Sequence, residues 1–229
     1  MSSKQPAQFE MMDDLLNSLG GISPKRVRLT PAPGTATVRD VARLLDMHKR
    51  KFELVDGTLV EKIMGQKESS VAVRLIILMG NWNDREGNIG MILGADGPFH
   101  LMKKLVRIPD VSFTNWNRLP GRKVPAEAVP DVVPDLAVEV LSEGNTRTEM
   151  ERKLKEYFLS EVTVVWFVDP EKRTVRIYTS PDDVTELSAA DTLSGGEVLP
   201  RFSVQVSRIF ADLGEAPKAA TKQKGKKKR

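Results

Sequence analysis

Three charged side chains are candidates for a catalytic role: two acids in mostly apolar strand-like segments, and a lysine in a predicted helix. They are Asp110 in "VRIPDVSF", Glu139 in "PDLAVEVLS" and Lys153 in "ERKLKEY". Two carboxylates on neighbouring strands can hold a hard divalent cation such as Mg²⁺, with water completing its coordination. A nearby lysine can orient or deprotonate an attacking water and stabilise developing negative charge. The combination predicts metal-assisted hydrolysis of a phosphodiester bond.

The two acids also have a purely structural interpretation. Asp110 follows Pro109, which has no N–H to donate, so this point suits a sheet edge, a divergence of two strands or a turn that Asp110 caps. Glu139 lies in a predicted strand, where a buried carboxylate without a partner is costly. A salt bridge formed near the end of this strand would therefore also account for an acid at this position. Strand alternation divides this segment into two faces, Leu136, Val138 and Val140 on one, and Ala137, Glu139 and Leu141 on the other.

Lys153 lies beside Tyr157 at the margin of the apolar stripe of a helix predicted over 147–159. A lysine in this position can run its aliphatic stem along the packed face and direct its ammonium group toward the sheet. The alternative is an ordinary surface pair between Glu149 and Lys153, which are four residues apart on the helix.

The surrounding pattern predicts one α/β (α+β) domain with a mixed sheet flanked by helices, because helices and strands alternate in the middle of the chain. Asp56-Gly57 between two apolar runs predicts a two-residue hairpin turn. Apolar periodicity predicts helices over 11–19, 38–49, 67–87 and 147–159. Strands are predicted in 51–63, in two or three segments of 90–114, in 135–141, 162–169 and 173–180, and in a small terminal unit near 193–210.

Composition narrows the classes of protein that this chain can represent. Its 229 residues suffice for one domain with a sizeable core. It has no cysteine, which excludes disulfides and thiolate chemistry and fits the reducing cytoplasm. It has no run of eighteen apolar residues, so no membrane span is expected, and the first residues do not resemble a signal peptide.

The positive charge of the chain is concentrated at its end. The formal net charge is +4, but the last twelve residues carry seven Lys or Arg and no acid, so the rest carries 28 basic and 31 acidic residues. We therefore predict a flexible N-terminal extension over residues 1–36, a domain over 37–213 and a disordered basic tail over 214–229. Such a tail is typically solvated, and it could also attract anionic polymers.

Five segments in order resemble the Uma-two family of putative restriction endonucleases, also classed as a domain of unknown function. They are "KFELVDGTLVEK", "VRIPDVSF", "PDLAVEVLS", "KLKEYFLSEVTVVWFVDPEKRTVRIY" and "LPRFSVQVSRIF", and the likeness spans about 38–211. The resemblance implies the PD-(D/E)xK nuclease superfamily, with a restriction-endonuclease-like core and Mg²⁺ (or Mn²⁺) as cofactor. It further implies nucleic acid, DNA before RNA, as substrate, and a homodimer as a plausible assembly.

The resemblance also implies roles for individual residues. Asp110 and Glu139 would form the acidic pair that binds the metal. Leu141 stands where the superfamily motif has its lysine, and members of the Uma-two type carry that lysine on the following helix, which matches Lys153 with Tyr157 beside it.

Two further acids are candidates for accessory roles. Glu53 matches the glutamate of the family's hairpin segment and could face the site or pair across the hairpin. Glu68 begins the long helix, where it could assist the metal, but an acid stabilised by the helix dipole is the interpretation that we favour.

Basic residues in the proline-rich loop 115–133 could contact phosphates, namely Arg118, Arg122 and Lys123. A solvated loop explains them equally well. The rival hypothesis for the whole chain is a nuclease-fold module that binds nucleic acid or protein without catalysis.

Overall fold

The computed structural model describes residues 9–47 and 50–214. The helices are α1 Met12–Ser18, α2 Val38–Met47, α3 Gln66–Arg85 and α4 Arg147–Leu159, with short 3₁₀ turns η1 Pro24–Arg26, η2 Trp116–Arg118, η3 Pro120–Arg122 and η4 Val206–Leu213. The strands are β1 Val27–Arg28, β2 Lys51–Val55, β3 Thr58–Lys62, β4 Gly90–Gly94, β5 Phe99–Met102, β6 Leu105–Arg107, β7 Val111–Asn115, β8 Leu136–Val140, β9 Val164–Asp169, β10 Thr174–Tyr178, β11 Val184–Leu187, β12 Thr192–Ser194 and β13 Ser203–Gln205. No helix in the described ranges is long and apolar enough to cross a membrane.

Two sheets form the body of the structure. The first has the order β1-β3-β2-β6-β5, and the second has the order β11-β10-β9-β8-β7-β4. In the second sheet β8 and β9 run parallel while their neighbours pair antiparallel, so the predicted mixed sheet is confirmed. The predicted hairpin is also present, because Asp56 and Gly57 both adopt positive φ between β2 and β3.

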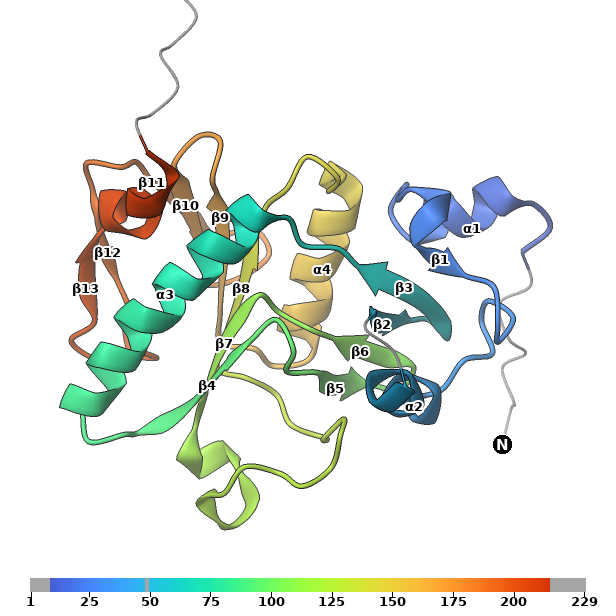
Figure 1. Ribbon diagram of the computed structural model, residues 1–229, viewed down its shortest axis with the longest axis horizontal. Coiled ribbons are helices and arrows are strands. Elements are labelled where there is room, and N and C mark those ends of the chain that lie inside the picture. Colours follow the sequence, from blue (N-terminus) through green and yellow to red (C-terminus); the bar gives the residue numbers. More distant parts are fainter. Residues whose placement is uncertain (1–8, 48–49, 215–229) are drawn as a thin grey trace, which may run out of the picture.

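Helices α3 and α4 cover opposite faces of the second sheet (Figure 1). The α3 stripe of Val71, Leu75, Met79 and Trp82 packs on the face that carries Leu136, Val138 and Val140 of β8. The α4 stripe of Met150, Leu154 and Tyr157 packs on the face that carries Ala137. The alternation predicted for β8 is therefore correct, and it turns Glu139 toward α4.

The chain passes from the first sheet to the second through a short link, Ile108-Pro109-Asp110, between β6 and β7. Pro109 stands where one strand has ended and the next has not begun, so its missing N–H interrupts neither ladder. Asp110 thus enters the second sheet beside β8, where its backbone N–H donates to the carbonyl of Val138 at 2.9 Å.

The expectation of a flexible extension over 1–36 is wrong for residues 9–36, which pack on the first sheet. Leu15, Leu19 and Ile22 are buried against Val55 and Val60 of the hairpin. The Pro-rich and charged composition of this segment did not indicate the packing, because only three of its apolar residues are buried in the contact with the hairpin. The predicted tail over 214–229 lies outside the described residues from 215 onward.

Gly20 links this N-terminal unit to the helix that carries Lys153. Its φ is +90°, and a Cβ built on it would lie 2.7 Å from the backbone N and Cα of Glu149 in the first turn of α4. Thr146, the N-cap residue of α4, donates its hydroxyl to the carbonyl of Gly20. The close approach of two backbones therefore requires glycine here.

We expect Gly20→Ala to destabilise the protein more than Gly21→Ala. Both substitutions place a Cβ at positive φ, which costs roughly 1–2 kcal/mol. Gly21 has no atom within 4 Å of its would-be Cβ, whereas Gly20 meets the α4 backbone. The clash should lower the free energy of unfolding of the Gly20 variant by about 1–3 kcal/mol more, measured by urea denaturation. Equal losses in the two variants would show that the contact with α4 is not tight.

Candidate active site

The predicted residues Asp110, Glu139 and Lys153 meet at the junction of the two sheets. Asp110 precedes β7 and Glu139 lies on the neighbouring strand β8, since Val111 pairs with Val138 in the antiparallel ladder. Lys153 lies on α4, over the face of β8 that carries Glu139. Both acids are only 4% exposed and Lys153 is 3% exposed, so the three groups form a buried polar cluster that needs internal partners.

Lys153 contacts Glu139 and not Glu149. Its ammonium lies 3.1 Å from each carboxylate oxygen of Glu139. The pair with Glu149 suggested by helix spacing is absent, because Glu149 is buried against Arg26 with contacts of 2.8 and 3.0 Å. Lys153 therefore follows the packed face of α4 toward the sheet, as the amphipathic position permits.

Tyr157 completes the contacts that α4 makes with Glu139. Its phenol donates a hydrogen bond of 2.6 Å to Glu139 Oε1. Burial and the adjacent Glu139 charge raise the pKa of Tyr157 well above its usual value, so the phenol remains a donor at neutral pH. Burial alone would raise the pKa of Glu139, but the charges of Lys153 and Lys62 outweigh it and lower that pKa. Glu139 is thus an ionised acceptor held in one orientation.

Lys62, at the end of β3, is a member of the site that the sequence did not indicate. Its ammonium lies 2.8 Å from Asp110 Oδ1 and 3.6 Å from Glu139 Oε2, and it donates to the carbonyl of Ile108. The other oxygen of Asp110 accepts from the N–H of Val140 at 2.7 Å. Burial raises the pKa of Asp110, Lys62 counteracts that shift, and the nearby Glu139 charge adds to it.

Glu53 faces the site from β2 and also pairs within its own sheet. It is fully buried, lies 2.6 Å from Arg107 and 3.4 Å from Lys153, and accepts from the N–H of Ile108 at 3.1 Å. Burial would raise its pKa, but Lys153 and Arg107 hold that pKa well below the usual range. Glu53 is therefore a second carboxylate partner of the Lys153 ammonium, beside Glu139.

These contacts form a continuous chain of alternating charge. In order of contact it runs Asp110, Lys62, Glu139, Lys153, Glu53, Arg107, Glu156, Arg152 and Asp56. We call this set the charge chain. It begins in the buried site and ends at the exposed hairpin turn, so every buried charge in it has an opposite neighbour, as burial demands.

Two groups of predicted residues do not contact the two acids in the part of the chain that the structure describes. Glu68 occupies the first turn of α3, and within the described residues no hydrogen bond or ion pair connects it to the acids. The basic loop follows the far end of β7, roughly 17 Å from Asp110 at about 3.3 Å per residue. Arg118 is engaged there by Asp135 at 2.7 Å and by Glu161 and Thr163, while Arg122 and Lys123 are exposed.

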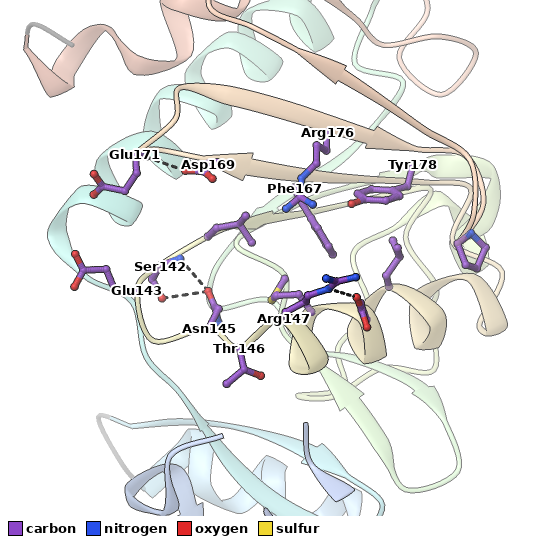
Figure 2. A pocket seen from close by; sticks show the side chains of 15 residues that line it. Ser142, Glu143, Asn145, Thr146, Arg147, Phe167, Asp169, Glu171, Arg176 and Tyr178 are labelled. Carbon is purple, nitrogen blue, oxygen red and sulfur yellow. Dashed lines mark hydrogen bonds and ion pairs between the residues drawn. The ribbon is translucent and has the colours of Figure 1, made fainter. Parts of the chain in front are cut away.

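Two cavities near the site differ in volume and in whether a residue of the charge chain that contacts the acids lines them. One cavity, of about 640 Å³, lies beside the first turn of α4. Among the residues that line it, Ser142 and Asn145 are joined by two hydrogen bonds, and Arg176 lies near Phe167 and Tyr178 (Figure 2). Its lining includes none of the three predicted catalytic residues. A cavity of about 190 Å³ reaches the charge chain directly, because Lys62 lines it together with Arg50, Lys51, Glu61, Met64 and Ala95.

The oxygen atoms that the site offers are of the type that a hard divalent cation binds. Asp110 and Glu139 offer carboxylate oxygens directed at one shared position, and the carbonyl of Ile108 faces the same place. Oxygen donors of this type suit Mg²⁺ or Mn²⁺. Within the described residues no three His, Asp or Glu side chains gather around a metal position. A cation here would therefore depend on the acid pair and on water.

Comparison with known proteins finds a solved structure of similar fold and a protein family whose model matches this chain. A crystal structure described as a putative nuclease belonging to DUF820, from Anabaena variabilis, superposes with a TM-score of 0.60 over 72% of this chain and 92% of that one, at 16% identity. A family model, Uma2, described as "Putative restriction endonuclease", matches residues 38–207. The chain belongs to the Uma2 family. A search of curated proteins finds no match.

Proposed function

We propose that this protein is a metal-dependent endonuclease of the cytoplasm that hydrolyses phosphodiester bonds in DNA. The observation that carries the proposal is the meeting of Asp110, Glu139 and Lys153, from a strand entrance, a neighbouring strand and a helix, in one buried cluster. Membership of the Uma2 family supports the same reaction class. Dimerisation remains a prediction from the resemblance.

Asp110 and Glu139 would hold Mg²⁺ or Mn²⁺. When bound, the cation would polarise the scissile phosphate and lower the pKa of a water molecule. The chain's own residues have separate tasks. Tyr157 and Lys153 fix the Glu139 carboxylate by contacts at 2.6 and 3.1 Å, and Val140 fixes Asp110 through its backbone N–H. Lys153 would position the attacking water and stabilise negative charge that develops on the phosphate.

One observation favours the alternative of a binding module without catalysis. Asp110 and Glu139 are almost fully buried, and each already contacts a lysine. A site that is neutralised in this way could serve the fold alone. However, buried ion pairs often only balance their desolvation cost, so their presence is weak evidence that they serve to stabilise the fold.

The test is cleavage of single-stranded DNA, double-stranded DNA and RNA with Mg²⁺ or Mn²⁺, by the wild type and by Asp110→Ala and Glu139→Ala. Glu149→Gln is the matched control, since Glu149 is an equally buried acid on α4 whose partner is Arg26. Circular dichroism verifies folding of each variant. The proposal predicts metal-dependent cleavage that both alanine variants lose and the control retains.

Cleavage that persists in both alanine variants would overturn the assignment of the site. Absence of cleavage on all three substrates, together with no change in the melting temperature on metal addition, would favour the binding module.

A further inference from the structure

The Lys62 ammonium contacts both of the acids that would hold the metal. It contacts Asp110 Oδ1 at 2.8 Å, Glu139 Oε2 at 3.6 Å and the carbonyl oxygen of Ile108. These are three oxygens, two from the link between β6 and β7 and one from β8, directed at one cation. The Lys62 side chain is 7% exposed, so these contacts are made largely out of water.

Charge balance makes the ammonium and a divalent cation mutually exclusive. The four buried acids of the charge chain face four bases, so this part of it is neutral: Glu53, Asp110, Glu139 and Glu156 against Lys62, Arg107, Lys153 and Arg152. Adding a divalent cation would leave two positive charges in excess within a few ångströms of Lys62. In a poorly solvated site that repulsion is several-fold stronger than in water, so the ammonium must leave when the metal enters.

The structure provides a place for the displaced side chain. Lys62 lines the cavity of about 190 Å³ at the open end of the hairpin formed by β2 and β3, beside Glu61. A lysine side chain has four rotatable bonds. A change of rotamer can therefore move its ammonium from the acids into this cavity without backbone movement.

We propose that Lys62 is a built-in counter-cation of the site, which neutralises Asp110 and Glu139 in the metal-free protein and is displaced when a divalent cation binds. The inference rests on the proposed function, in that it takes these two acids as the metal ligands. Metal affinity would then be set by a competition within the chain, and the metal-free protein would remain folded without its cofactor.

The experiment compares Mn²⁺ binding by the wild type, Lys62→Met and Lys51→Met using isothermal titration calorimetry. Lys51 lines the same cavity but pairs with Asp96 and not with the acids, which makes it the matched control. Without its competitor, the Lys62 variant should bind Mn²⁺ roughly tenfold more tightly or better. Its melting temperature without metal should fall, because two buried acids lose a partner, and Mn²⁺ should raise it more than in the wild type.

A second measurement uses the wild type alone and so does not depend on a variant that folds. Reductive methylation followed by mass spectrometry reports how exposed each lysine amine is. Lys62 should resist modification without metal and react faster at saturating Mn²⁺, whereas Lys153 should stay protected in both states.

The outcomes separate this inference from the function on which it rests. If the wild type and Lys62→Met bind Mn²⁺ equally and Asp110→Ala abolishes binding, the metal site stands and the role of Lys62 is wrong. Weaker binding by Lys62→Met, or unchanged methylation of Lys62 at saturating Mn²⁺, would also overturn it. If neither protein binds Mn²⁺, both the metal site and the counter-cation fail.

Discussion

Replacing Lys153 by methionine should reduce metal-dependent cleavage on the order of 100- to 1,000-fold, the loss typical when one preorganised charge-stabilising group is removed. Methionine keeps most of the stem that packs on α4 but removes the ammonium that contacts Glu139 and Glu53. Both acids retain other partners, since Tyr157 and Lys62 remain on Glu139 and Arg107 remains on Glu53. The variant should therefore fold.

The control variant is Lys155→Met on the same helix. Lys155 is exposed and two residues away, so its replacement controls for the loss of a positive charge on α4. Cleavage rates at saturating metal and the Mn²⁺ dissociation constant would be measured for both variants. Slow cleavage with near-normal Mn²⁺ binding is expected for Lys153→Met. A rate within about threefold of wild type would remove Lys153 from the mechanism, being a barrier change below ~1 kcal/mol.

Replacing Glu53 by glutamine should lower the free energy of unfolding at pH 7 by about 3–5 kcal/mol, the cost of removing one partner of a buried ion pair. Arg107, now 2.6 Å from Glu53, would lose the opposite charge of this carboxylate, and Lys153 would lose one of its two carboxylate partners. Urea denaturation followed by circular dichroism measures the loss.

The pH dependence of this effect has a definite sign. The folded protein holds the pKa of Glu53 below the usual value of 4.5. Its contribution to stability is therefore complete above that pH and declines as the pH falls below it. The difference between wild type and Glu53→Gln should narrow progressively below pH 4.5. A difference under about 1 kcal/mol at pH 7 would contradict the argument, since exposed pairs contribute that little.

A double variant tests whether the cost arises from the unpaired charge. Glu53→Leu with Arg107→Met removes both partners, and Glu156 still has Arg152 at 2.7 Å. The double variant should be more stable than Glu53→Gln, because an apolar replacement of both partners avoids leaving a buried charge alone.

The sequence was informative wherever a local pattern determined the direction of a side chain. Period-two alternation in β8 correctly placed Glu139 on the face opposite Leu136, and a divergence of two strands was one of the alternatives that Pro109 indicated at Asp110. The helical stripe placed Lys153 beside Tyr157 on the face that packs on the sheet.

The contributions of distant segments could not be predicted in this way. Lys62 reaches the site from 46 residues before Ile108, and nothing in the hairpin sequence distinguishes it from an ordinary lysine at a strand end. The choice of Glu149 between Arg26 and Lys153 depends on how the N-terminal unit docks, which the local helix spacing does not contain. Such pairs are set by the tertiary structure, and sequence spacing predicts only the pairs within one element.

The link Ile108-Pro109-Asp110 has a consequence for how the protein folds. The charge chain draws residues from both sheets and from α4, and the contact between Glu53 and Lys153 closes a loop of 100 residues. Contacts of such long range form late, after the entropy of loop closure has been overcome. Neither sheet alone could assemble the site, so a fragment or a partly opened state that separates the two sheets would keep much of its secondary structure and lose the site entirely. Formation of the cluster therefore reports on the docking of the two sheets across Pro109.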